Sequence, residues 1–321
     1  HYDDGAVYGF PTKYENSRWI LINEDMFKEA GLDIPYDGWT YSEFLADAEK
    51  LTHGEGQDKV YGVCWARKQS GKSILYALDG VLGANQIYKN EEGTEVNFDN
   101  DVYRAGLNLV KETLDKGYAI PIEDEFSEDI SVANTFLQGK CAIMLGVAQM
   151  RLCMDQENYP HDFMTALVPA PVPDDEKYNT EFYRKQIGTT GAGDLLSISA
   201  NTKYPEASFE FAMWYLKGGM SPLVQGGRIP LWNGVNKDEV LGVLKEKAQG
   251  SIDMDSMENY LSLDTTQGVA AIKGHASSEI SSAWFEEFDA MCYGKQSVDQ
   301  TVQNMEKRGN ELIQTELSSQ K

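Results

Sequence analysis

Short apolar runs alternate with stretches of helical periodicity along most of the chain, and this alternation predicts an α/β fold. The run 141–145 is apolar without any polar alternation, as expected of a strand that is covered on both faces. Other strands are predicted wherever β-branched and aromatic residues cluster between turn residues. The predicted strands are 7–11, 19–22, 60–65, 141–145 and 195–199.

Capping residues mark where the predicted helices begin. Asn23 precedes a helix over 24–30, and Thr40 and Glu43 have the spacing of a capping box. Further helices are expected to open at Asp99, at Pro205 and near the C-terminus. Trp39 and Trp214 are also expected in the core. The residues predicted to face inward are Phe44, Ala48 and Leu51; Val102, Gly106, Leu109, Val110 and Leu114; Phe209, Ala212, Met213 and Leu216; and Val298, Val302, Met305 and Leu312.

The net charge of the chain argues against some classes of binding partner. The 321 residues carry a net charge of −23, which argues against nucleic acid and against anionic lipid as partners. An acidic surface favours solubility, and a cationic ligand is the alternative explanation. No apolar run approaches the roughly 20 residues that span a bilayer. We therefore expect neither a nucleic-acid site nor a transmembrane segment.

The chemistry-bearing residues show no catalytic or metal-binding pattern. HExxH and GxSxG are absent, and Gly71-Lys72-Ser73 lacks the glycine that a phosphate-binding loop needs at position 66. The four histidines are scattered, and the acidic pair Glu286–Glu287 is the kind of neighbour that an acidic chain produces by chance. The sequence therefore predicts a protein without catalytic residues, metal or cofactor.

Four cysteines in 321 residues are too few for a disulfide framework, and none of them belongs to a CxxC pair. We expect Cys64, Cys141, Cys153 and Cys292 to be buried free thiols. One disulfide remains an alternative that the sequence leaves open.

Several segments, in chain order, resemble the extracellular solute-binding proteins of the sugar-binding family that includes maltose-binding protein. Each segment alone is a common strand-plus-cap pattern, whereas their shared order across most of the chain is specific. The segments are 4–11 (DGAVYGFP), 20–32 (ILINEDMFKEAGL), 39–44 (WTYSEF), 136–146 (FLQGKCAIMLG), 196–207 (LSISANTKYPEA) and 227–230 (GRIP).

This resemblance implies a type II periplasmic-binding-protein fold, with two α/β lobes joined by hinge strands and an incomplete N-terminal lobe. The opening part of the family's N-terminal lobe has no counterpart, so we expect a processed or truncated piece. Residues 1–16 and 187–235 would form the residual N-terminal lobe, and 17–186 and 236–321 the C-terminal lobe, with the hinge near 14–19.

The resemblance also implies a function, which is to trap a sugar or oligosaccharide between the lobes and present it to the membrane permease subunits of an ABC importer. The protein would be an extracytoplasmic monomer, either periplasmic or lipid-anchored on the outer face of the cell membrane. It would bind its ligand without chemically changing it.

Sugar sites combine aromatic rings with a few fixed hydrogen-bond partners, and this guides the choice of candidate residues. Asn16 aligns with a hinge-side polar residue of the relatives, and Trp65 ends a predicted strand. Gln149 follows Ala148, which replaces a stacking tryptophan of the relatives. The full set of candidate ligand-binding residues is Tyr14, Asn16, Trp65, Arg67, Gln149, Arg228, Trp232 and Trp284.

Three other functions remain open from the sequence. The ligand could be a polyamine, a metal chelate or a peptide, in which case carboxylates rather than aromatic rings would line the site. A carbohydrate-active enzyme would need two carboxylates about 5–10 Å apart across a groove. A sensor subunit would present the ligand to a membrane receptor instead of a transporter.

Overall fold

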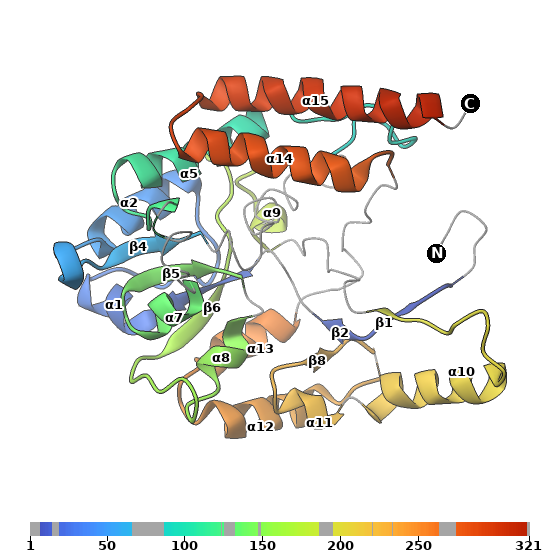
Figure 1. The fold of residues 1–321 in the computed structure, drawn as a ribbon. Helices are drawn as coiled ribbons and strands as arrows, with labels where there is room; N and C mark the ends of the chain where they lie inside the picture. The colour runs from blue at the N-terminus through green and yellow to red at the C-terminus, as the bar shows by residue number, and fades with distance from the viewer. Residues whose placement is uncertain are drawn as a thin grey trace.

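The computed structural model describes residues 7–14, 19–65, 87–122, 124, 132–146, 149–185, 195–219, 221–232, 234–262 and 274–319. It shows a mixed α/β architecture, in which helices surround one larger sheet and a smaller group of strands lies to one side (Figure 1).

The larger sheet has four strands in the order β4-β5-β3-β6. They are β3 (Trp19–Asn23), β4 (Tyr61–Cys64), β5 (Cys141–Leu145) and β6 (Thr165–Pro169). β4 and β5 are parallel, and β3 runs antiparallel to β5 and β6. The predicted strand at 141–145 is confirmed with its bounds, and those at 19–22 and 60–65 are confirmed with small shifts at their ends.

Both faces of this sheet are covered, and β3 shows why its sequence is apolar throughout. Ile20 and Ile22 belong to one core, whereas Trp19 and Leu21 belong to the other. Since successive side chains of a strand point to opposite faces, a strand between two helical layers needs apolar residues at every position.

The helices divide between the two cores. The first core receives side chains from α1 (Glu24–Glu29), α2 (Tyr41–Leu51), α5 (Asp101–Asp115), α14 (Ser277–Cys292) and α15 (Val298–Ser319). The second receives them from α7 (Val132–Leu137), α8 (Met150–Cys153), α11 (Ser221–Val224), α12 (Lys237–Ala248) and α13 (Met254–Ser262).

Two small sheets form the second group of strands. β1 (Phe10–Pro11) pairs with β7 (Leu195–Leu196), and β2 (Lys13–Tyr14) pairs with β8 (Ile229–Pro230), both antiparallel. The predicted strands at 7–11 and 195–199 are therefore present but shorter. Each pair joins the start of the chain to a segment far along it, which brings both segments to one side of the larger sheet.

The predicted helix starts are largely confirmed by side-chain caps. Asn23 Oδ1 accepts a hydrogen bond from the Met26 amide at 3.1 Å, and Thr40 and Glu43 form the complete capping box. The predicted start at Asp99 is wrong by one residue. Asn100 is the cap instead, because its Oδ1 accepts from the Tyr103 amide at 3.0 Å.

The predicted inward stripe of α10 (Pro205–Trp214) is wrong at Phe209, which is 50% exposed. Trp214, which was expected separately in the core, is 60% exposed, and within the helix only Ala212 is buried. Phe211, which was not assigned to the stripe, is 56% exposed. Aromatic residues therefore stand on more than one side of α10.

A disulfide bond joins Cys64 of β4 to Cys141 of β5, so the expectation of four free thiols is wrong for this pair. Their strands are neighbours, and both residues face the second core. The Cα–Cα separation of 6.3 Å lies within the usual disulfide range. Cys153 is a buried free thiol as expected, whereas the free thiol of Cys292 is only half-buried.

None of the described helices combines the length and the apolar character that crossing a membrane requires.

A half-buried carboxyl on α2 gives the first testable consequence of the fold. Burial raises the pKa of Asp47 from 3.8 to about 6. The negative charges of Glu43 and Asp33 also raise this pKa, whereas the positive charge of Lys50 lowers it. The folded chain therefore holds this proton more tightly than the unfolded chain. The contribution of Asp47 to stability is greatest below pH 3.8 and is lost as the pH rises to about 6.

We expect Asp47→Asn to be more stable than the wild type at pH 7.5 by about 1 kcal/mol, a value reduced for the partial exposure of the carboxyl. The melting temperature should rise by about 2–4 °C at pH 7.5 and by nothing near pH 4, as measured by thermal unfolding across this range. Glu29→Gln removes the same charge from an exposed position and is the control. An equal gain in both variants would contradict a specific effect of Asp47.

Candidate ligand-binding site

At one end of the larger sheet, the ends of its four strands lie together. β4, β5 and β6 end there and β3 begins there, because Ile20 pairs with Leu145, Trp19 with Pro169, and Cys64 with Met144. We call this end of the sheet the carboxyl edge. In open α/β sheets, ligands bind in the crevice outside the carboxyl ends of the strands. The carboxyl edge is therefore where the site is to be sought.

Trp65 follows β4 at the carboxyl edge, but its ring is buried in the first core. It is 5% exposed, and its Nε1 donates to Thr113 Oγ1 at 2.8 Å. Trp284 is likewise a core residue in this structure, 1% exposed and stacked on Phe288 with the ring centroids 4.9 Å apart. Neither ring presents a face to solvent.

Three of the candidate ligand-binding residues are at least partly exposed to solvent, and a fourth lies on a strand beside two of them. Gln149 is half-buried just before α8, beyond the end of β5. Trp232 is 41% exposed just after β8. Arg228 precedes β8 and is exposed, and Tyr14 of β2 pairs with its neighbour Ile229. The structure thus brings Tyr14, Arg228 and Trp232 to one pair of strands. Asn16 and Arg67 lie outside the described residues.

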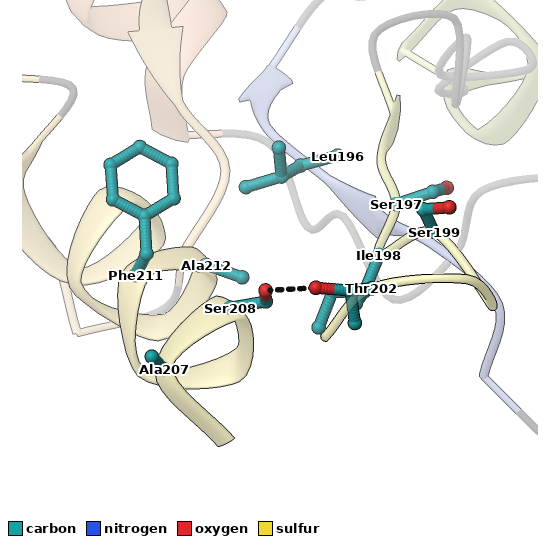
Figure 2. A pocket seen from close by; sticks show the side chains of 9 residues that line it. All are labelled: Leu196, Ser197, Ile198, Ser199, Thr202, Ala207, Ser208, Phe211 and Ala212. Carbon is teal, nitrogen blue, oxygen red and sulfur yellow. Dashed lines mark hydrogen bonds between the residues drawn. The ribbon is translucent and has the colours of Figure 1, made fainter. Parts of the chain in front are cut away.

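A cavity of about 450 Å³ lies elsewhere, between the segment after β7 and α10 (Figure 2). Its walls are mostly apolar, and two of its hydroxyls bond to each other, Thr202 Oγ1 and Ser208 Oγ at 3.2 Å. None of the candidate residues lines it. The residues that line it are Leu196, Ser197, Ile198, Ser199, Thr202, Ala207, Ser208, Phe211 and Ala212.

The sequence analysis assigned these residues only to a strand and to the helix that follows it. The signal that could have revealed an open surface here is the spread of aromatic residues around α10. With few hydroxyls left for a ligand, the cavity suits an apolar group better than a sugar.

The acidic pair Glu286–Glu287 has a structural role. Arg308 donates to Glu286 and to Glu287, each at 2.6 Å. Burial alone would raise the pKa of Glu287, but hydrogen bonds from Arg308, Gln296 and Asn304 together lower it. A general acid of a glycosidase needs a raised pKa, so Glu287 does not suit that role.

No group of histidine, cysteine and acidic side chains suited to a metal ion occurs in the part of the chain that the structure describes. His53, His161 and His275 are bound separately, to Leu51 O, to Gln156 and Tyr159 O, and to Glu316.

A comparison with known families follows from this fold. Residues 2–217 match the family described as bacterial extracellular solute-binding protein. The chain belongs to this family. The resemblance inferred from its sequence segments is thereby confirmed, and the larger part of both groups of strands lies inside the matched region.

Solved structures similar to this solute-binding protein share its fold at low identity. One is a sugar transporter from Rhizobium etli in an open conformation, with a TM-score of 0.68 and 18% identity over 97% of this chain and 73% of the other. Another is an ABC substrate-binding protein from Listeria monocytogenes in complex with cycloalternan, with a TM-score of 0.68 and 18% identity over 97% and 72%.

A third is an ABC transporter solute-binding protein from Agrobacterium vitis with bound D-mannitol, with a TM-score of 0.63 and 17% identity over 97% and 74%. Together these structures confirm the type II periplasmic-binding-protein fold. This solute-binding protein spans about three-quarters of their length.

Proposed function

We propose that this protein captures a sugar or oligosaccharide outside the cytoplasm and delivers it to the membrane permease subunits of an ABC importer. The observation that carries the proposal is the family match across residues 2–217, on a fold shared with proteins whose ligands include cycloalternan and D-mannitol. Lipid anchoring to the outer face of the membrane and a monomeric state belong to the same proposal.

The mechanism is a hinge trap. Residues 1–16 and 187–235 form one lobe and residues 17–186 and 236–321 form the other, with the ligand held between them at the carboxyl edge. Closure takes place because the ligand contacts both lobes in the closed form and only one in the open form. Of the candidate residues, Gln149 serves the larger lobe, and Tyr14, Arg228 and Trp232 serve the smaller one. Asn16 and Arg67 complete the proposed set.

Trp65 and Trp284 are left out of the proposed set because both rings are buried in the core. The protein binds and releases the ligand without changing it chemically. The ion-paired state of Glu286 and Glu287 supports this view.

A thermal-shift screen tests the proposal. The panel holds D-mannitol, maltose, maltotriose and cycloalternan, with spermidine, an amino-acid mixture and glucose 6-phosphate as other classes. A ligand at 100 times its dissociation constant adds about 2.7 kcal/mol to the free energy of unfolding, so the melting temperature should rise by several degrees. We expect a shift with one or more sugars, and chromatography should recover the sugar intact. A shift confined to spermidine or glucose 6-phosphate would overturn the sugar assignment.

A further inference from the structure

The short helix α9 (Glu181–Lys185) occupies an unusual place in the chain. It is the last described element before the chain passes from the larger sheet to β7 in the smaller group of strands. In Figure 1 it is drawn in the middle of the molecule. No function is predicted for this segment from its sequence.

Hydrogen bonds tie the segment before α9 to the carboxyl edge. Trp39 Nε1 donates to the carbonyl of Pro169, the last residue of β6, at 3.0 Å. The Val172 amide then donates to Trp39 O at 3.0 Å, and the Tyr41 amide donates to Val172 O at 2.8 Å. The chain therefore leaves β6 alongside the start of α2 and arrives at α9 without leaving this end of the larger lobe.

Arg184 fixes α9 itself in place. Its Nη1 donates to Gly38 O at 2.8 Å, and its Nε and Nη2 donate to Asn179 Oδ1 at 2.8 and 2.5 Å. A Cβ on Gly38 would lie 3.0 Å from Arg184 Cβ, and the φ of Gly38 is +84°, so a side chain there would disturb this contact. Arg184 therefore bonds both to Asn179, which precedes α9, and to Gly38 of the larger lobe. These contacts hold the segment to the larger lobe.

Three aromatic rings form a connected row on this anchored segment. Tyr178 meets Tyr183 edge-to-face at 5.6 Å, and Tyr183 meets Phe182 edge-to-face at 5.2 Å. The two tyrosines are partly buried against the first core, whereas Phe182 is 52% exposed. Phe182 is therefore an outward ring that two inner rings hold in position, unlike a lone apolar residue on a flexible loop.

A fixed hydrogen-bond donor lies in the same segment, three residues before Phe182. Two of the three hydrogen bonds from Arg184 go to Asn179 Oδ1, so the Asn179 Nδ2 group remains available, and it makes no hydrogen bond to a described residue. An outward aromatic ring with an oriented amide donor near it is the combination that a sugar requires, an apolar ring face edged by hydroxyls.

We propose that Phe182 and Asn179 form a ligand subsite on the larger lobe, in which Phe182 stacks on a sugar ring and Asn179 donates to one of its hydroxyls. This rests on the proposed function. Because Arg184 holds the segment in place before a ligand binds, Phe182 loses little conformational entropy on binding. The subsite helps to set which sugar the protein selects.

Isothermal titration calorimetry tests the subsite with whichever of D-mannitol, maltose, maltotriose and cycloalternan gives a thermal shift with the wild type. We expect Phe182→Ala to raise the dissociation constant at least tenfold, Phe182→Tyr to change it less than threefold, and Asn179→Ala to raise it severalfold. Phe211→Ala removes an equally exposed ring from α10 and should leave the dissociation constant unchanged.

The controls separate the possible failures. Phe182→Ala should keep the wild-type melting temperature without ligand, since its ring is exposed, and the sugar should slow amide exchange over 176–185 in the wild type. A wild type that binds a sugar with the same affinity as Phe182→Ala overturns the subsite alone. A wild type that binds none of the four sugars overturns the sugar assignment and the subsite with it.

Discussion

Replacing Trp284 by alanine will lower the free energy of unfolding by about 3–5 kcal/mol, the usual cost of removing a large buried aromatic ring. The ring is 1% exposed, lies parallel to Phe288 at 4.9 Å and meets Phe285 edge-to-face at 5.1 Å. Its Nε1 makes no hydrogen bond to a described residue, so the loss comes from packing and not from a broken polar contact.

Urea unfolding of Trp284→Ala and Trp284→Phe checks this assignment. The phenylalanine variant keeps an aromatic ring in the same position and should lose clearly less stability than the alanine variant. Trp232→Ala is the matched control, since its ring is 41% exposed, and its stability should change by less than about 0.5 kcal/mol. If Trp284→Ala kept wild-type stability, the core role would be wrong and the residue would return to the set of ligand contacts.

The second large effect is expected at the disulfide between Cys64 and Cys141. The bond closes a loop between residues 77 positions apart, and such a cross-link stabilises a fold by about 2–4 kcal/mol. We expect the double variant Cys64→Ala/Cys141→Ala to lose about this much, and the wild type to lose a similar amount under a reducing agent.

The measurement is urea unfolding with and without dithiothreitol, together with a thiol count in denaturant. The wild type should show two reactive thiols, those of Cys153 and Cys292. Cys292→Ala is the control, and its response to dithiothreitol should equal that of the wild type. Four reactive thiols before reduction, with no effect of dithiothreitol on unfolding, would contradict the bond.

The elements that the sequence predicts well are those with a local cause. The capping box at Thr40 and the cap at Asn23 are decided by residues three positions apart. The buried strand at Cys141–Leu145 is visible because the alternation expected of a half-exposed strand is missing. These features do not depend on what lies across the molecule.

The features that the sequence misses depend on distant neighbours. Cys64 and Cys141 become partners only because β4 and β5 are adjacent in the sheet. Periodicity alone predicts a buried stripe on α10, because it assumes a core that the described residues do not supply there. A tryptophan such as Trp65 can equally lie in a core or in a site, and only its burial and its hydrogen bond to Thr113 in the folded chain distinguish the two.

The last helix of the chain has a consequence for the order in which the protein folds. Glu306 of α15 accepts from the Phe98 and Asp99 amides, and Asn310 accepts from the Val96 amide, so residues more than 200 positions apart meet here. α14 and α15 lie together over the first core (Figure 1). A chain emerging from the ribosome therefore cannot complete this core before α15 has been synthesised. Closure of this core is expected to be slow, because segments that are distant in the sequence must find each other.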